Sequence, residues 1–168
     1  MPMKIYSEDE IFNLIGDAYL SLIHLGDGVD EDANKILNLS SGVDNNVISK
    51  LLCGQSWRER LVGLVLATDR GPDQFFKSLT ESLFDIRGIS IIPTCAVMSI
   101  AVTSFGFKYK PNVLSDLDRS IFDGELGTAI DHFHFAIGDG KEPSITHGEN
   151  YGQEFENHKA FYLKLSAL

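Results

Sequence analysis

The sequence predicts an all-α fold, formed either by stacked antiparallel helical hairpins or by an irregular bundle of about eight to nine helices. Apolar residues recur at helical spacing along almost the whole chain. Strict alternation of apolar and polar residues over strand length is hard to find, and helix start and stop residues agree with the helical spacing. A chain of 168 residues has the size of one hydrophobic core, so we expect residues 1–168 to form a single domain.

Three helices are expected in the first third of the chain. Ser7 and Glu10 form a capping box that begins a helix near 7–24, and Gly26 is its stop. An acidic helix follows near 30–38, and a third helix occupies 43–53. The side chains expected to face inward are Ile11, Leu14, Ile15, Ala18 and Leu22 in the first helix, and Val47, Leu51 and Leu52 in the third.

The middle of the chain has the best-defined helix boundaries. Ser56 and Glu59 form a second capping box, and Gly71 ends the helix that they begin. Pro72 then occupies the first position of the next helix, which extends up to Gly88. The side chains of these two helices that are expected to face inward are Trp57, Leu61, Leu64, Val65, Thr68, Phe75, Phe76, Leu79, Leu83 and Ile86.

An uncharged segment lies between Arg87 and Lys108 and is long enough to span a bilayer. Its serine, threonine, proline and glycine residues lower its hydropathy, and the flanking helices are amphipathic, which requires a protein core. We therefore expect a central buried helix near 90–105, with Pro93 in its first turn, and no membrane-spanning segment.

The last third predicts three more helices and the only long loop of the chain. Helices are expected near 112–123, 125–137 and 153–166, and a run of turn-forming residues predicts the loop between 138 and 153. The inward-facing side chains are Leu114, Leu117 and Ile121 in the first helix, Leu126, Ile130, Phe133 and Ile137 in the second, and Phe155, His158, Tyr162 and Leu165 in the third.

The formal charge of −10 is concentrated at the two ends of the chain. Residues 1–50 hold 3 basic and 9 acidic side chains (−6), residues 51–110 hold 7 and 5 (+2), and residues 111–168 hold 4 and 10 (−6). Because a protein that tracks phosphates carries a basic stripe, this distribution argues against a nucleic-acid partner. It favours either a basic macromolecular partner or an acidic surface that only keeps the protein in solution. The candidate partner-binding residues form two acidic patches, Asp27, Asp30, Glu31 and Asp32 in the first and Asp116, Asp118, Asp123 and Glu125 in the second.

No residue pattern predicts catalysis, a metal ion or a cofactor. His132 and His134 are two apart on a predicted helix and point about 200° apart, so they do not chelate one ion together. Glu154 and His158 have helical spacing but no second pair to complete a site, and the acidic run from Asp27 lacks the glycine and the glutamate of a calcium loop. We therefore expect a protein that is not an enzyme. A catalytic site assembled from distant residues of the last third is the least favoured hypothesis.

The N-terminus and the two cysteines predict a cytoplasmic protein. Three acidic residues occur by position 10, and the order of charged and apolar residues is not that of a signal peptide. Cys53 and Cys95 lie in separate apolar helices, which is typical of buried thiols in a reducing compartment.

The segment SWRERLVGLVLATDR resembles the helical hairpins of HEAT-like proteins, in which an aromatic residue and an arginine begin a helix that packs on its neighbours. Trp57, Arg58 and Arg60 are the matching positions, and the resemblance implies that they stabilise the hairpin. In size and charge the whole chain resembles the small, acidic, all-helical immunity proteins of bacterial contact-dependent inhibition and related polymorphic toxin systems. That resemblance implies tight binding of a cognate toxin domain, often a basic nuclease, in the cytoplasm of the producing cell, with the active site of the toxin blocked. The alternative is a non-enzymatic scaffold or adaptor that binds another protein.

Overall fold

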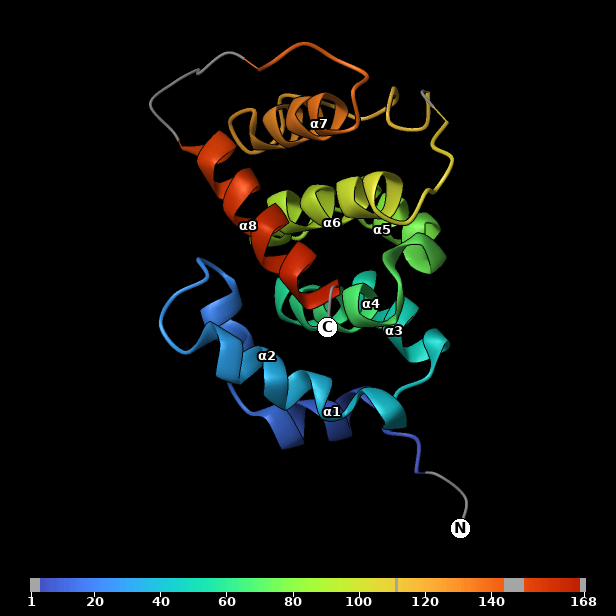
Figure 1. The fold of residues 1–168 in the computed structure, drawn as a ribbon. Helices are drawn as coiled ribbons and strands as arrows, with labels where there is room; N and C mark the ends of the chain where they lie inside the picture. Colours follow the sequence, from blue (N-terminus) through green and yellow to red (C-terminus); the bar gives the residue numbers. More distant parts are fainter. Residues whose placement is uncertain (1–3, 111, 144–149, 167–168) are drawn as a thin grey trace.

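The computed structural model describes residues 4–110, 112–143 and 150–166, and within these ranges it contains helices and no strand (Figure 1). The predicted all-α fold is therefore confirmed. The eight α-helices of the described residues are α1 (Glu8–Ile15), α2 (Val29–Leu37), α3 (Asn45–Leu52), α4 (Trp57–Arg70), α5 (Phe76–Phe84), α6 (Ile91–Thr103), α7 (Glu125–Ala136) and α8 (Tyr151–Ser166). Short 3-10 helices lie between them, namely η1 (Ala18–Leu22), η2 (Ser40–Gly42), η3 (Pro72–Phe75) and η4 (Gly88–Ser90).

The uncharged helix α6 is the centre of the bundle. Every residue from Ile91 to Ala101 is buried. Helices α4, α5, α7 and α8 all pack against α6, and Figure 1 shows it between α7 on one side and α4 on the other. A helix that is apolar all round suits a position with protein on every side, so the predicted central buried helix is confirmed. Among the described residues, no helix has both the length and the apolar character that crossing a membrane requires.

The closing helix α8 makes the molecule an irregular bundle. It packs against α6, α4 and α7, and in Figure 1 it crosses the molecule from the end of α7 to the level of α4. In a stacked hairpin array each unit contacts only its neighbours in sequence, whereas α8 lies on helices from two distant parts of the chain. Its buried side chains include the four predicted from the sequence, Phe155, His158, Tyr162 and Leu165.

The first predicted helix, near 7–24, is divided in two at Gly16. Gly16 has a positive φ of 58°, and its N–H donates to the Phe12 carbonyl at 3.0 Å, so α1 ends there and the chain continues as η1. The predicted cap is present, because the Ser7 hydroxyl accepts from the Glu10 N–H at 3.2 Å. Ile11, Ile15, Ala18 and Leu22 are buried as expected. Leu14 was predicted to face inward and is instead 57% exposed.

The predicted helix near 112–123 is wrong, because this segment forms consecutive turns. Side chains here take the backbone hydrogen-bonding groups that a helix would use. Asp118 Oδ1 accepts from the Ser120 N–H at 3.0 Å, and the Ser115 hydroxyl donates to the Asn112 carbonyl at 2.8 Å. Phe122 and Asp123 have φ values of 55° and 56°, which no right-handed helix accommodates. Of the three predicted core residues, Leu114 is buried, Leu117 is half-buried and Ile121 is exposed. The expectation of a single long loop also fails, since residues 104–110 and 112–124 form no helix. Residues 144–149 of the loop predicted between 138 and 153 lie outside the described residues.

The remaining helices begin and end within a few residues of their predicted positions. The second capping box is only half formed, because the Ser56 side chain makes no capping hydrogen bond. Glu59 Oε2 accepts instead from the N–H of Gln55 at 2.9 Å, one residue earlier than expected. The α4 helix still begins at Trp57, and Gly71 is its C-cap, as predicted.

Candidate functional site

The first candidate acidic patch lies at the beginning of α2. Asp27 precedes the helix, and Asp30, Glu31 and Asp32 occupy its first turn. The N-cap residue is Gly28, which supplies no capping side chain, so these carboxylates face the positive end of the helix dipole. We call these four acidic residues the α2 acidic patch. All are exposed except Asp32, which is half-buried.

The negative charge of the α2 acidic patch is little compensated. Lys164 of α8 places its Nζ 3.7 Å from Asp30 Oδ2, and both side chains are 67% exposed. Such a solvent-exposed pair contributes at most about 1 kcal/mol. Asp27, Glu31 and Asp32 have no ion pair within the described residues. The patch therefore presents several unpaired carboxylates to solvent.

The second candidate patch is dispersed. Asp116, Asp118 and Asp123 are exposed in the turns before α7. Hydrogen bonds from the Ser120 hydroxyl and N–H lower the pKa of Asp118, so this carboxylate is engaged by its own loop. Glu125 begins α7, is half-buried, and lines a small cavity of about 30 Å³ together with Glu154 and His158. In Figure 1 the segment before α7 and the helix α2 lie at opposite ends of the molecule, so the fold does not join the two patches into one surface.

A cluster of aromatic rings and one arginine lies beside α2, on α1, η1 and α4. The Phe12 and Tyr19 rings meet edge to face with centroids 6.1 Å apart, and Tyr19 meets Trp57 at 5.8 Å in the same way. The guanidinium carbon of Arg58 lies 4.9 Å from the Trp57 ring centroid and 5.8 Å from that of Tyr19. These four residues are called the aromatic-arginine cluster. The three rings are half-buried and Arg58 is exposed.

The three elements that carry the aromatic-arginine cluster, η1, α1 and α4, all pack against α2, the helix that carries the α2 acidic patch. Arg58 has no ion pair with a carboxylate within the described residues, so its charged group is held only over the two rings. The helical spacing predicts that Trp57 faces the core, and the resemblance to HEAT-like hairpins implies that Arg58 stabilises the hairpin. Neither points to Phe12 or Tyr19. The adjacent tryptophan and arginine at a helix start were the only sequence feature that could have indicated this surface.

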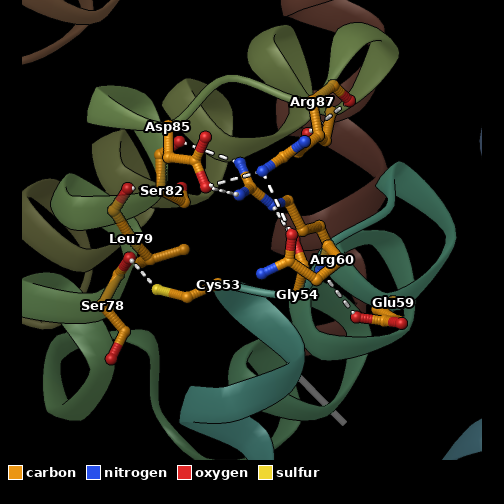
Figure 2. A network of polar contacts seen from close by, with 11 residues as sticks. Cys53, Gly54, Glu59, Arg60, Ser78, Leu79, Ser82, Asp85 and Arg87 are labelled. Atoms are coloured by element: carbon orange, nitrogen blue, oxygen red, sulfur yellow. Dashed lines mark hydrogen bonds and ion pairs between the residues drawn. The ribbon is translucent and has the colours of Figure 1, made fainter.

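Arg60 has a different environment, although it lies only two residues from Arg58. It is 2% exposed, and it donates from Nε to the Gly54 carbonyl and from Nη1 to the Ser82 carbonyl, each at 2.9 Å (Figure 2). Its Nη2 lies 3.7 Å from Asp85 Oδ2. Burial lowers the pKa of Arg60, and the Asp85 carboxylate opposes this effect. These contacts join the turn after α3 to the end of α5, which is the stabilising role that the sequence resemblance implied.

Burial shifts the pKa values of both cysteines and of His158. Burial raises the pKa of Cys95 to about 12, and it raises the pKa of Cys53, whose thiol donates to the Ser78 carbonyl at 3.3 Å. Both thiols are therefore protonated at neutral pH and are poor nucleophiles. Burial lowers the pKa of His158 to about 4. No group of three or more potential ligands able to hold a metal ion occurs in the described part of the chain.

Comparison with known proteins returned no match to a family model, a curated protein or a solved structure. Function is therefore inferred from the two surfaces around α2 rather than from a relative.

Proposed function

We propose that this protein is a cytoplasmic immunity protein that binds a cognate basic toxin domain and blocks its active site, as in bacterial contact-dependent inhibition. The observation that carries the proposal is the aromatic-arginine cluster, in which Arg58 lies on the rings of Tyr19 and Trp57 without a carboxylate partner in the described chain. Tryptophan, tyrosine and arginine are the residues that dominate the binding energy of protein interfaces.

The stacking of the cluster favours tight binding. Edge-to-face contacts hold Tyr19 against Phe12 and Trp57, so the rings are already ordered before a partner arrives. Association then costs less side-chain entropy, which amounts to about 0.5–1.5 kcal/mol for each side chain that binding immobilises. A pre-ordered group of large side chains at the surface is well suited to be the centre of an interface.

The α2 acidic patch supports a basic partner. Its unpaired carboxylates lie on α2, against which the elements of the cluster pack, so we expect one basic toxin surface to contact both. Carboxylates can occupy the places that substrate phosphates take in a basic nuclease groove. Charge complementarity of this kind mainly increases the association rate and makes it dependent on salt.

The decisive test is co-expression with the small basic C-terminal domain of a large secreted protein encoded in the adjoining gene. We expect rescue of growth and co-purification of the two proteins. Trp57→Ala combined with Arg58→Ala should abolish the rescue, because it removes the central contacts. The matched control is Phe84→Ala, which removes an aromatic side chain that is 53% exposed on α5.

Two results would contradict this proposal. Growth rescue that persists in the double variant at wild-type level would show that the cluster is not the contact. Co-purification without any rescue of growth would favour the scaffold or adaptor function. Neutralising the α2 acidic patch with Asp27→Asn, Asp30→Asn and Glu31→Gln should slow association at low salt. An unchanged association rate and salt dependence would refute the electrostatic part.

A further inference from the structure

A hollow of about 330 Å³ lies between α5 and the chain that follows α6. Phe76, Phe107 and Val113 line it, and the rings of Phe76 and Phe107 stack with their centroids 4.1 Å apart. The same hollow is lined by the lysines Lys77, Lys108 and Lys110, and by Thr80 and Glu81. We call this set of residues the lysine groove. Its size is at the lower end of the range for ligand-binding clefts.

The lysine groove is cationic on a protein whose formal charge is −10. All three lysines are exposed, and Lys77 pairs with Glu81 at 3.8 Å. Lys108 and Lys110 have no ion pair within the described residues. Two unpaired ammonium groups beside an apolar hollow complement a ligand that carries negative charges next to an apolar group.

One wall of the groove is formed by residues 107–110, which belong to no helix. The rings of Phe107 and Tyr109 both contact Phe76, with centroids 4.1 and 5.8 Å away, whereas Lys108 between them is exposed. This alternation of side chains is typical of a strand. Among the described residues, the backbone N–H groups of Lys108 and Lys110 donate no hydrogen bond. The segment therefore has an open edge next to a hollow.

We propose that the lysine groove binds an extended acidic segment of a partner protein, which adds as a strand along residues 107–110. The main chain of the segment pairs with the N–H and C=O of Lys108 and with the N–H of Lys110. One apolar side chain enters the hollow beside Phe107, and flanking carboxylates pair with the two lysines. The Lys110 carbonyl already accepts from the Val113 N–H at 3.2 Å, and this contact ends the pairing.

This surface is distinct from the one proposed for the toxin. The lysine groove belongs to α5 and the chain after α6, whereas the aromatic-arginine cluster belongs to α1, η1 and α4. Its three lysines repel a basic domain, so we do not expect the basic toxin domain to bind in this groove. Either proposal can therefore fail while the other holds.

The test uses the whole protein and three short synthetic peptides, with binding measured by calorimetry at low and high salt. The first peptide has the sequence Glu-Glu-Leu-Glu-Glu, the second has glutamines in place of the glutamates, and the third is the first with its leucine amide N-methylated. We expect binding of the first peptide only, and amide NMR shifts that centre on residues 107–110. Lys108→Glu combined with Lys110→Glu should weaken binding about tenfold or more.

The matched control is Lys50→Glu combined with Lys141→Glu, which changes the net charge equally at exposed lysines outside the groove. Four results would overturn the proposal. The first two are no binding of the first peptide at low salt, and an equal loss of its affinity in the groove variant and in the control variant. The other two are equal affinity for the first and the N-methylated peptide, and NMR shifts away from the groove. A salt-sensitive dimer in sedimentation that is lost in the Lys108 and Lys110 variant would identify a second copy as the occupant, and would also overturn it.

Discussion

Arg58 and Arg60 lie two residues apart on α4 and illustrate two uses of the same side chain. Arg60 is 2% exposed and donates to the Gly54 and Ser82 carbonyls. Arg58 is exposed and rests on the Trp57 and Tyr19 rings. Two positions on a helix differ in direction by about 200°, so one arginine faces the core and the other faces solvent. The difference indicates that Arg60 stabilises the fold, while the exposed Arg58 is the one that we propose contacts a partner.

The largest effect is expected from Arg60→Met, which keeps much of the buried aliphatic chain and removes the guanidinium. It leaves the Gly54 and Ser82 carbonyls without their donor, so the free energy of unfolding should fall by about 3 kcal/mol. Urea denaturation followed by circular dichroism measures this change. A loss below about 1 kcal/mol would show that the network in Figure 2 contributes little.

A pH effect of similar size is expected from His158, which is 4% exposed and whose Nδ1 has no hydrogen-bond partner among the described residues. Burial lowers its pKa from 6.5 to about 4, so the unfolded chain binds a proton more readily than the folded one. The stabilising contribution is fully present above pH 6.5, and about 3 kcal/mol of it is lost as the pH falls toward 4.

The measurement is the slope of unfolding free energy between pH 6.5 and 4.5 in wild type, in His158→Leu and in His24→Gln. His158→Leu should flatten the slope, whereas His24→Gln, which removes only a minor contribution to the lowered pKa of His158, should flatten it slightly. Identical slopes in all three proteins would contradict the assignment to His158.

The core-facing side of α4 also contains Gly63, where an added Cβ would lie 2.9 Å from the Leu52 backbone nitrogen. Gly63→Ala therefore forces α3 and α4 apart, and we expect a loss of about 2 kcal/mol in thermal or urea unfolding despite the better helix propensity of alanine. An unchanged or higher stability would show that the two helices separate without cost.

The smallest effect on stability is expected from Arg58→Met. Removing an exposed guanidinium from two rings costs about 0.5 kcal/mol, so the midpoint of urea unfolding should hardly change. A shift in the urea midpoint as large as that of Arg60→Met would contradict the different roles given to the two arginines. For the affinity for the toxin domain, Arg58→Met should have the larger effect of the two variants. We expect it to weaken binding about 30-fold.

Most of the helices could be predicted because each has its own periodicity and end residues. Two expectations failed where local chemistry prevailed over periodicity. Gly16 ends α1 with a positive φ, and the side chains of Asp118 and Ser115 form hydrogen bonds with the backbone of Ser120 and Asn112. In both places the apolar spacing of a helix continues through residues that favour a turn.

The candidate site was less predictable than the fold. The α2 acidic patch is a run of adjacent residues, so the sequence alone was enough to locate it. The aromatic-arginine cluster combines Phe12, Tyr19 and Trp57 from three elements, and the first two come together across the break at Gly16. Its formation depends on a backbone break that the periodicity did not predict. The function of both surfaces stays a prediction.

The central position of α6 has a consequence for biosynthesis. The ribosome completes α6 before α7 and α8 exist, yet these later helices cover much of its surface. Until they emerge, the nascent chain presents an uncharged apolar helix to solvent, and such exposure favours aggregation. Helix α8, which is made after α6, thus completes the burial of α6. Chaperone demand should therefore peak between the synthesis of α6 and that of α8.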